Sequence, residues 1–334
     1  MDKEDTTPIG GYFGLELPEK KVSDFHSECR FVNSGRNALR LILELMTNNG
    51  KGDVLQKIYL PYYTCEAVLQ PIKELHLNFE FYHISSQLKI SDLPAVKDGE
   101  CIILTNYFGL FDSYIKTLTE FYGPKAIIDN AQAWYCPAPS DLYSFYSPRK
   151  YFGLPDGGAL CGPSLNNLML PEGISWHKAS HLLKRLDIGA EQGYDDFKCN
   201  SATLAKEKPS EISALTRALL ASIDMENVKE KRRKNFSLLH DNLQQINKLE
   251  LPSLSEFECP MVYPLLVEEP GLRQILLENK IYTATYWPNV FDWCSPQSTE
   301  YYLARHLIPL PVDQRYSEIE MRRIINIIRG SYPV

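Results

Sequence analysis

The stretch Ser144-Phe-Tyr-Ser-Pro-Arg-Lys150-Tyr-Phe-Gly-Leu-Pro-Asp-Gly-Gly158 places a single lysine between a hydroxyl-rich strand end and a Gly-Gly turn. A lysine takes part in covalent chemistry only when its ammonium group loses a proton readily and its position is fixed. Lys150 stands where a lysine that forms a Schiff base would stand. The rest of the chain is therefore expected to supply its partners.

Short apolar runs alternate with helical patterns around this stretch. Strands are expected at residues 57–60, 79–82, 101–104, 126–129, 142–146 and 158–161. Helices with apolar residues at 3.6-residue spacing are expected at residues 36–46, 66–76 and 113–121. Such alternation is typical of an α/β fold in which crossover helices join parallel strands.

The C-terminal part has its own, smaller pattern. Helices are expected at residues 177–186, 212–223 and 226–246, followed by strands at 261–267, 281–285 and 307–310 and a helix at 272–279. Ser317-Glu-Ile-Glu320 reads as a capping box for a closing helix. We therefore expect a large domain over residues 1–230 and a smaller one over residues 231–334.

Composition narrows the class of protein. The 334 residues are 44% hydrophobic and 23% charged, which suits a folded globular enzyme. A formal net charge of -7 argues against nucleic acid or an anionic membrane as a partner, because both select clustered Lys and Arg. The densest basic run, residues 229–234, includes Arg232 and Arg233 and is interpreted as the solvent-facing side of a helix.

The cysteines give no sign of a metal site or a redox pair. The eight cysteines are never closer than 25 residues, so no C-x-x-C pair exists, and reduced thiols are the simplest interpretation. The N-terminus lacks the pattern of a signal peptide, and no apolar run approaches the ~20 residues of a membrane span. A soluble cytoplasmic protein without a metal ion is expected.

Asp129 is the first candidate partner of Lys150. It ends the apolar run Ala126-Ile-Ile-Asp129 and is followed by Asn130-Ala-Gln132, and ligands of open α/β sheets bind beyond the carboxyl ends of the strands. A carboxylate there could hold the protonated ring nitrogen of a pyridine cofactor through a hydrogen bond of roughly 1.5–3 kcal/mol, which keeps the ring an electron sink. The alternative is an aspartate that only caps the next turn.

The second candidate partner is the turn Ser34-Gly-Arg-Asn-Ala-Leu39, where Gly35 directly precedes the first helix. Backbone N–H groups and the positive end of a helix bind anions, and a glycine lets a phosphate approach closely. Ordinary N-capping by Ser34 is the alternative. Neither nucleotide-binding fingerprint, G-x-x-x-x-G-K-[ST] or G-x-G-x-x-G, is present.

In chain order, a phosphate turn, a strand-end Asp-x-x-Gln and a Ser-x-x-Lys followed by Gly-Gly describe a pyridoxal-phosphate enzyme. The chain resembles the DegT/DnrJ/StrS family of sugar aminotransferases. The resemblance runs through Gly10-Gly-Tyr-Phe13, Ser34-Gly-Arg-Asn-Ala-Leu39, Leu60-Pro-Tyr-Tyr-Thr64, Ile127-Ile-Asp-Asn-Ala-Gln132, Ser147-Pro-Arg-Lys150, Gly157-Gly158 and Leu310-Pro-Val-Asp-Gln-Arg-Tyr316. It implies the fold type I architecture, with a large α/β/α domain around a mostly parallel sheet and a smaller C-terminal α/β domain.

The resemblance also implies a role for individual residues. Lys150 would be the Schiff-base lysine and would later move a proton between substrate and cofactor carbons. Asp129 would pair with the ring nitrogen, and Gln132 would contact the side of the ring that carries the hydroxyl group. The phosphate of pyridoxal 5'-phosphate would be bound by Gly35, Arg36, Asn37 and Ser147, the last preferred over Ser144 for its three-residue spacing from the lysine.

Several positions depart from the commoner family pattern. Arg36-Asn37 replace small or hydroxyl residues of the phosphate turn, and Cys65 stands where an aromatic side chain often stacks on the ring. Tyr107 is a candidate for that stacking role. Residues 193–196, Gly-Tyr-Asp-Asp, lie where relatives often carry an asparagine that reaches the phosphate of the neighbouring subunit, so this contact is not carried over.

The resemblance implies an aminotransferase that moves an amino group from an amino acid, glutamate in the usual case, to a nucleotide-linked keto sugar. Its active sites would be built between the two subunits of a homodimer. A second hypothesis is a non-catalytic sugar- or cofactor-binding regulator on the same scaffold. A dehydratase related to this family is disfavoured, because such relatives replace the lysine by histidine.

Overall fold

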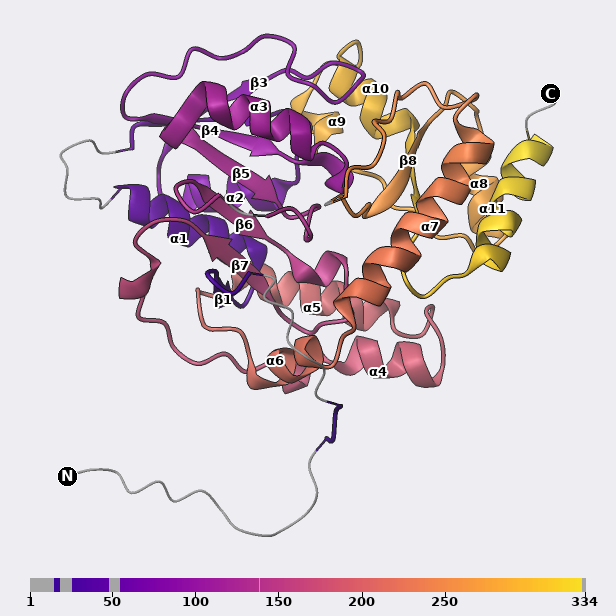
Figure 1. The fold of residues 1–334 in the computed structure, drawn as a ribbon, viewed down its shortest axis with the longest axis horizontal. Helices are drawn as coiled ribbons and strands as arrows, with labels where there is room; N and C mark the ends of the chain where they lie inside the picture. The colour runs from indigo at the N-terminus through magenta and orange to yellow at the C-terminus, as the bar shows by residue number, and fades with distance from the viewer. Residues whose placement is uncertain (1–14, 19–25, 48–54, 138, 257, 332–334) are drawn as a thin grey trace.

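The computed structural model describes residues 15–18, 26–47, 55–137, 139–256 and 258–331, so the Gly10-Gly-Tyr-Phe13 motif lies outside the described residues. A seven-stranded sheet occupies one end of the molecule (Figure 1). Its strands are β1 (Arg30–Val32), β2 (Lys57–Pro61), β3 (Asn78–Tyr82), β4 (Glu100–Thr105), β5 (Ala126–Asn130), β6 (Tyr143–Tyr146) and β7 (Gly158–Cys161). All six strands expected in this part of the chain are confirmed, and only the three-residue β1 was not expected.

The strand order is β1-β7-β6-β5-β4-β2-β3. Strand β7 runs antiparallel to β1 and to β6, whereas β2, β3, β4, β5 and β6 pair in parallel. The expected mostly parallel sheet is confirmed. The parallel register sets the carboxyl ends of β5 and β6 side by side, which brings Asp129 into the neighbourhood of the segment that leads to Lys150.

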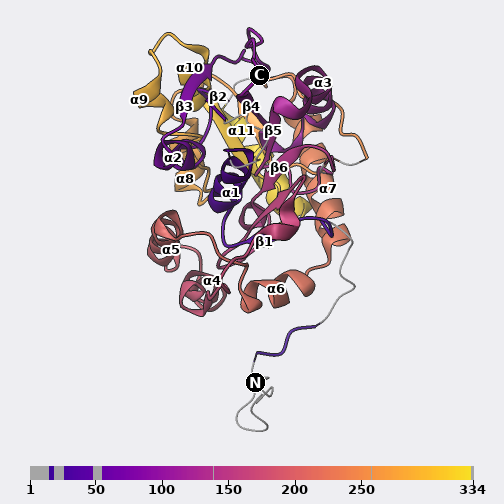
Figure 2. The same ribbon diagram turned by 90° about the vertical axis from the view of Figure 1, so that its left-hand side faces the viewer.

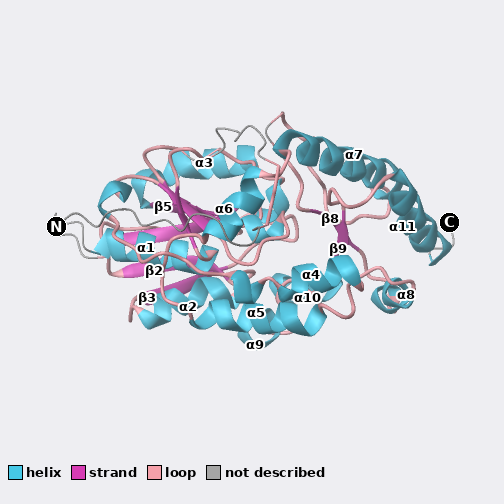
Figure 3. Cartoon of the chain, turned by 90° about the horizontal axis from the view of Figure 1, so that it is seen from below, coloured by secondary structure: helices cyan, strands magenta, loops and turns pink. Residues whose placement is uncertain are grey.

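Helices cover both faces of this sheet (Figure 3). Helices α1 (Gly35–Thr47) and α2 (Glu66–Glu74) lie on one face and α3 (Asp112–Tyr122) on the other. Because successive side chains of a strand point to opposite faces, neighbours in β2 and β4 enter different cores. Ile58 and Ile103 belong to the core under α1 and α2, whereas Tyr59 and Ile102 belong to the other core. The result is the α/β/α layering that the sequence predicts.

The C-terminal part contains a two-stranded antiparallel sheet, β8 (Val262–Leu266) with β9 (Leu307–Pro311), and the helices α8 (Leu272–Glu278) and α11 (Glu318–Ser331). The capping box is present, because the Glu320 carboxylate accepts the Ser317 backbone N–H at 2.7 Å. The strand expected at 281–285 is wrong. The backbone there bonds to α8 instead, through Ile281 N–H to Leu276 O at 2.8 Å and Arg273 Nη1 to Ala284 O at 3.0 Å.

Two short helices that the sequence did not reveal return to the large sheet. Figures 1 and 2 show α9 (Val290–Trp293) and α10 (Thr299–His306) beside β3. The fully buried Glu300 accepts the Ile84 backbone N–H at 2.7 Å, and Asn289 Nδ2 donates to Thr64 O at 2.9 Å. The C-terminal part is therefore joined to the edge of the large sheet by polar contacts.

Four helices connect the two parts: α4 (Ser180–Asp187), α5 (Tyr194–Lys206), α6 (Ala214–Ala221) and α7 (Met225–Leu243). Helices α4 and α6 lie below β1 and β7 in Figure 1, and α5 lies beside these strands. Helix α5 was not expected from the sequence, because it buries only Asn200 and Leu204 and so carries little apolar periodicity. The expected domain boundary at residue 230 falls inside α7.

Arg232 corrects the interpretation of the basic run as solvent-facing. Its side chain is 2% exposed, its Nε donates to Gln314 Oε1 at 2.9 Å, and its two Nη groups donate to Met261 O and Tyr151 O, both at 3.0 Å. Charge density along the sequence cannot distinguish a solvated arginine from one that satisfies backbone carbonyls inside the fold. Among the described helices, none is both long and apolar enough to cross a membrane.

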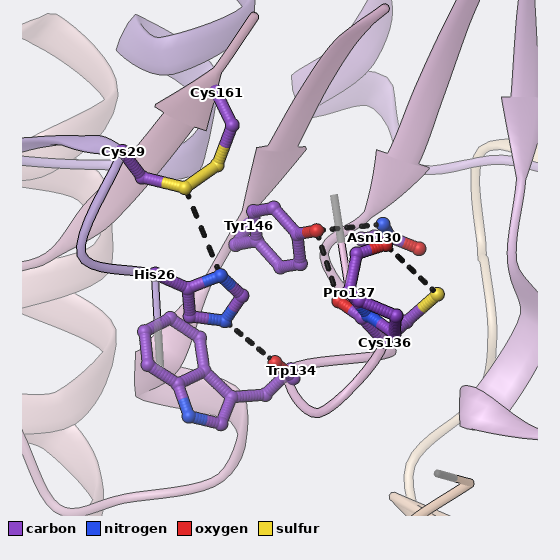
Figure 4. Close-up of a disulfide and its surroundings, with 8 residues drawn as sticks. All are labelled: His26, Cys29, Asn130, Trp134, Cys136, Pro137, Tyr146 and Cys161. Carbon is purple, nitrogen blue, oxygen red and sulfur yellow. Dashed lines mark hydrogen bonds between the residues drawn. A yellow bond between two sulfur atoms is a disulfide. The ribbon is translucent and has the colours of Figure 1, made fainter. Parts of the chain in front are cut away.

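Cys29 and Cys161 form a disulfide, which corrects the expectation that all thiols are reduced (Figure 4). The antiparallel β1–β7 pairing places the two Cα atoms 4.4 Å apart although 132 residues separate them in the chain, so local spacing gave no signal. His26 Nδ1 lies 3.7 Å from Cys29 Sγ, and His26 Nε2 lies 2.7 Å from Trp134 O. The remaining six cysteines are free.

Candidate active site

Lys150 ends the 3-10 turn Pro148–Lys150, four residues beyond strand β6. Its backbone N–H donates to Ser147 O at 3.1 Å, which fixes the turn. The side chain is exposed and makes no hydrogen bond to any described residue. An exposed ammonium on a fixed backbone can reach a ligand that lies above the carboxyl ends of β5 and β6.

Asp129 lies in β5, next to β6, and is 5% exposed. Burial raises the pKa of its carboxyl group, and the positive charge of Lys150 and the Ala131 backbone N–H, 2.9 Å from Oδ1, act in the opposite direction. The bond to Ala131 is the turn cap that the alternative interpretation expects. The second oxygen, Oδ2, makes no hydrogen bond within the described ranges, so it is free to accept a proton donor from a ligand.

Gln132 lies close to the residue that follows Lys150, because its carbonyl accepts the Tyr151 hydroxyl at 2.8 Å. It is 2% exposed, and its Oε1 accepts the Phe108 backbone N–H at 3.2 Å. Its Nε2 is buried without a hydrogen-bond partner in the part of the chain that the structure describes. A buried donor left unpaired costs about 1–3 kcal/mol, so a ligand oxygen is the partner to expect. The hydroxyl of a pyridoxal ring fits this requirement.

The phosphate turn, Ser147 and the Gly-Gly turn meet in space. A Cβ on Gly35 would lie 3.1 Å from Tyr146 O and 3.3 Å from Ser147 Cβ. A Cβ on Gly158 would lie 2.2 Å from Ser34 C, so only a glycine lets the two backbones approach this closely. Three segments that are distant in sequence therefore form one rim around the first turn of α1.

Ser34 and Asn37 hold this turn. Ser34 Oγ accepts the Asn37 backbone N–H at 3.2 Å, which is the N-capping bond considered as the alternative. The Asn37 side chain is buried and donates to Asn33 Oδ1 at 2.9 Å and to Glu207 O at 3.0 Å. These bonds occupy the Asn37 amide, whereas the Arg36 side chain has a buried Nε without a partner among described residues.

Tyr151, the residue after Lys150, is anchored by the C-terminal part of the chain. Its carbonyl accepts Gln314 Nε2 at 2.8 Å in addition to Arg232, and its hydroxyl lies 2.8 Å from Gln132 O and 3.0 Å from Cys259 O. This anchor was not predicted from the sequence. The residue that could have indicated it is Gln314, which lies in the Leu310–Tyr316 stretch that carries part of the resemblance.

The candidate stacking residue Tyr107 is 3% exposed, and its hydroxyl donates to Tyr63 O at 2.8 Å. Its ring packs against Tyr63 and Trp287, with centroids 5.8 and 6.3 Å apart. Cys65 is half-buried at the start of α2. The stacking role of Tyr107 stays a prediction.

The fold and the rim of the site together define a class of protein: a fold type I α/β protein with a lysine, a buried carboxylate and a glycine turn at the carboxyl ends of its strands. No protein-family model and no curated protein matches the sequence. Solved structures do match. The sugar aminotransferase CalS13 from Micromonospora echinospora superimposes with a TM-score of 0.63 at 17% identity, over 91% of this chain and 88% of that one.

Two further solved structures extend the comparison. A DegT DnrJ EryC1 StrS aminotransferase from Brucella abortus matches with a TM-score of 0.59 at 19% identity, over 90% of this chain and 85% of that one. The E. coli GDP-4-keto-6-deoxy-D-mannose-3-dehydratase with bound hydrated PLP matches with a TM-score of 0.61 at 13% identity, over 90% and 87%. The expected fold type I architecture is confirmed, and the resemblance to the sugar aminotransferases is confirmed at the level of the fold.

Proposed function

We propose that this chain is a pyridoxal 5'-phosphate-dependent aminotransferase of the DegT/DnrJ/StrS family that transfers an amino group from an amino acid to a keto sugar. The observation that carries this proposal is a set of four groups around the turn that ends at Lys150: the exposed Lys150, the buried Asp129, the Gln132 amide and the Gly35 turn. Among the described residues, Asp129 Oδ2 and Gln132 Nε2 have no hydrogen-bond partner. These groups match the aldehyde, ring nitrogen, ring hydroxyl and phosphate of pyridoxal phosphate, in that order.

When bound, pyridoxal phosphate supplies an electron sink for a carbanion at the substrate carbon. The residues of this chain hold and orient it. Lys150 Nζ would hold the cofactor and would serve as the base that moves a proton at the substrate carbon. Asp129 Oδ2 would accept the ring N–H, and this positive partner would favour the ionised carboxylate that burial disfavours.

Glutamate as donor and a nucleotide-linked keto hexose as acceptor follow from the family resemblance. The matching structures support a sugar substrate, because they include a sugar aminotransferase and a GDP-sugar dehydratase. The proposal also includes a cytoplasmic homodimer that binds neither nucleic acid nor a membrane. Exposed apolar side chains on α4 and α5, Leu183, Leu186, Tyr194 and Phe197, offer a surface for a second chain.

Borohydride reduction of the cofactor-loaded protein, followed by peptide mass mapping, tests the proposal. The label is expected on Lys150, and Lys150→Ala is expected to abolish transamination. The wild type is expected to show ping-pong kinetics with an amino acid and a keto sugar, because the amino group rests on the enzyme between two half-reactions. A label on another lysine, or transamination by Lys150→Ala, would contradict it.

The second candidate function is a non-catalytic sugar- or cofactor-binding regulator. It is favoured by Cys65 at the usual stacking position and by Arg36-Asn37 in the phosphate turn. A single-turnover experiment separates the two. An aminotransferase loaded with pyridoxal phosphate and given glutamate releases one 2-oxoglutarate per site, whereas a regulator binds ligands and releases none.

A further inference from the structure

Two arginines beside the phosphate turn lack counter-ions. The Nε atoms of Arg36 and Arg149 are both buried, and neither guanidinium makes a hydrogen bond or an ion pair with a described residue. Both side chains are half-buried, so the Nε donor of each is removed from water without a partner, and the planar donors of a guanidinium match the oxygens of carboxylate or phosphate. An anion from outside the chain is therefore the expected partner.

Arg36 and Arg149 lie on neighbouring segments, which meet at Gly35 and Ser147. Arg36 follows Gly35, which approaches Ser147 so closely that an added Cβ would lie 3.3 Å from Ser147 Cβ. Arg149 is two residues beyond Ser147, on the turn that ends at Lys150. Burial lowers the pKa of Arg149; the charge of Asp156 acts against this, and that of Arg36 adds to it. Two like charges held this close favour a ligand that carries more than one negative charge.

Within the described ranges, no acidic side chain pairs with either guanidinium group. Asp156, the acidic group whose charge acts on Arg149, is fully buried and already accepts the Ser213 backbone N–H at 3.2 Å, the Ser213 hydroxyl at 3.0 Å and the Thr216 hydroxyl. Its oxygens serve the start of α6 and make no ion pair with Arg149 within the described residues. The positive charges of Arg36 and Arg149 therefore remain available to a bound anion.

We propose that Arg149, together with Arg36, binds the phosphate of the cofactor from within the same chain. This inference rests on the proposed function and adds a binding residue to it. A phosphate monoester carries about -1.5 to -2 charges at neutral pH and three acceptor oxygens, which suits two guanidinium groups better than a single carboxylate does. In relatives, an asparagine in the segment that corresponds to residues 193–196 often reaches the phosphate of the neighbouring subunit, and this chain has no asparagine there. Arg149 would supply a phosphate contact in its place.

The test compares equilibrium binding of pyridoxal phosphate and of pyridoxal, which lacks the phosphate, to apoprotein variants. Arg149→Gln is expected to weaken pyridoxal phosphate about tenfold to a hundredfold and to leave pyridoxal unchanged, because only the phosphate contact is lost. Inorganic phosphate should compete with the cofactor in the wild type and much less in this variant. Arg149→Lys, which keeps the charge, should recover part of the affinity.

Arg305→Gln, at an exposed arginine on α10, is the matched control and should change nothing. Thermal unfolding of each apoprotein identifies a folding defect, which would weaken both ligands equally and overturn the proposal. Unchanged binding of pyridoxal phosphate by Arg149→Gln, with covalent attachment to Lys150 intact, would also overturn it and leave the proposed function standing. A wild type that attaches no cofactor would refute the proposed function itself.

Discussion

Asp129 is subject to two opposing requirements. Burial raises the pKa of its carboxyl group, whereas its proposed role requires the ionised form. A carboxyl group whose folded-state pKa lies above the unfolded value of about 3.9 favours folding while it is protonated. This contribution is complete below the unfolded pKa and is lost as pH rises through the folded pKa. Relative to low pH, the buried carboxyl group of Asp129 therefore makes folding of the apoprotein less favourable at neutral pH.

Asp129→Asn is expected to separate these effects. The apoprotein of this variant should be more stable than the wild type at pH 8 and should lose that advantage at pH 4, because asparagine cannot ionise. Its kcat should fall about tenfold to a hundredfold, because the charged bond to the ring nitrogen is lost. Thermal unfolding at both pH values and steady-state kinetics measure the two effects.

Asp98→Asn, at an exposed carboxylate that pairs with Lys125, is the control and should show neither effect. A variant of Asp129 that is less stable than the wild type at pH 8 would contradict the argument. So would a variant with full activity.

At the scale of elements, the close approach of β7 to the turn before α1 shapes the phosphate site. Gly158→Ala would place a Cβ 2.2 Å from Ser34 C, and two backbones cannot move apart as a flexible side chain can. We expect a loss of stability of about 1–3 kcal/mol and weaker binding of pyridoxal phosphate. Urea unfolding and cofactor titration measure these changes.

Gly330→Ala in α11 is the matched control, because an added Cβ there meets no atom within 4 Å. It should be neutral or stabilise the helix by up to about 1 kcal/mol. Equal destabilisation by the two substitutions would refute the backbone clash at Gly158.

The Cys29–Cys161 disulfide joins β1 to β7 on the sheet edge that carries this turn. Cys29→Ser is expected to lower the free energy of unfolding by about 2–4 kcal/mol in non-reducing buffer, because the unfolded chain loses a long covalent loop. The difference should vanish when both proteins are reduced. Denatured, unreduced wild type should show six reactive thiols and reduced protein all eight; eight before reduction would contradict the disulfide.

For the whole molecule, Arg232 connects α7, β8 and the residue after Lys150. Arg232→Met keeps most of the volume but leaves buried carbonyl groups without donors, and we expect a loss of about 2–4 kcal/mol. Because Tyr151 would be held less firmly, kcat should fall more than the affinity for pyridoxal phosphate. Chemical unfolding and kinetics measure both.

Arg322→Met removes an exposed arginine that pairs with Glu318 on α11 and should change stability by less than about 0.5 kcal/mol. If Arg232→Met changed the free energy of unfolding as little as Arg322→Met, the hydrogen bonds of Arg232 would not be what holds the two parts of the chain together.

The elements that the sequence predicted correctly are those with local periodicity. The apolar runs of β2 to β7 and the amphipathic helices α1 and α3 each bury a regular set of side chains. Strand β1, with three residues, and helix α5, with two buried residues, are too weakly patterned to be recognised. The strand expected at 281–285 failed because its backbone finds partners in α8, a contact that its own composition does not encode.

The sequence by itself determined the fold class, the candidate lysine with Asp129 and Gln132, and the glycine turn, because periodicity and short motifs act through neighbouring residues. Tertiary structure alone decided that Arg232 is buried, that Cys29 meets Cys161 and that Arg149, near Arg36, has no ion-pair partner in the part of the chain that the structure describes. These facts depend on the pairing of β1 with β7 and on the packing of α7 across β8. Such contacts join residues far apart in the chain, and local sequence carries no record of them.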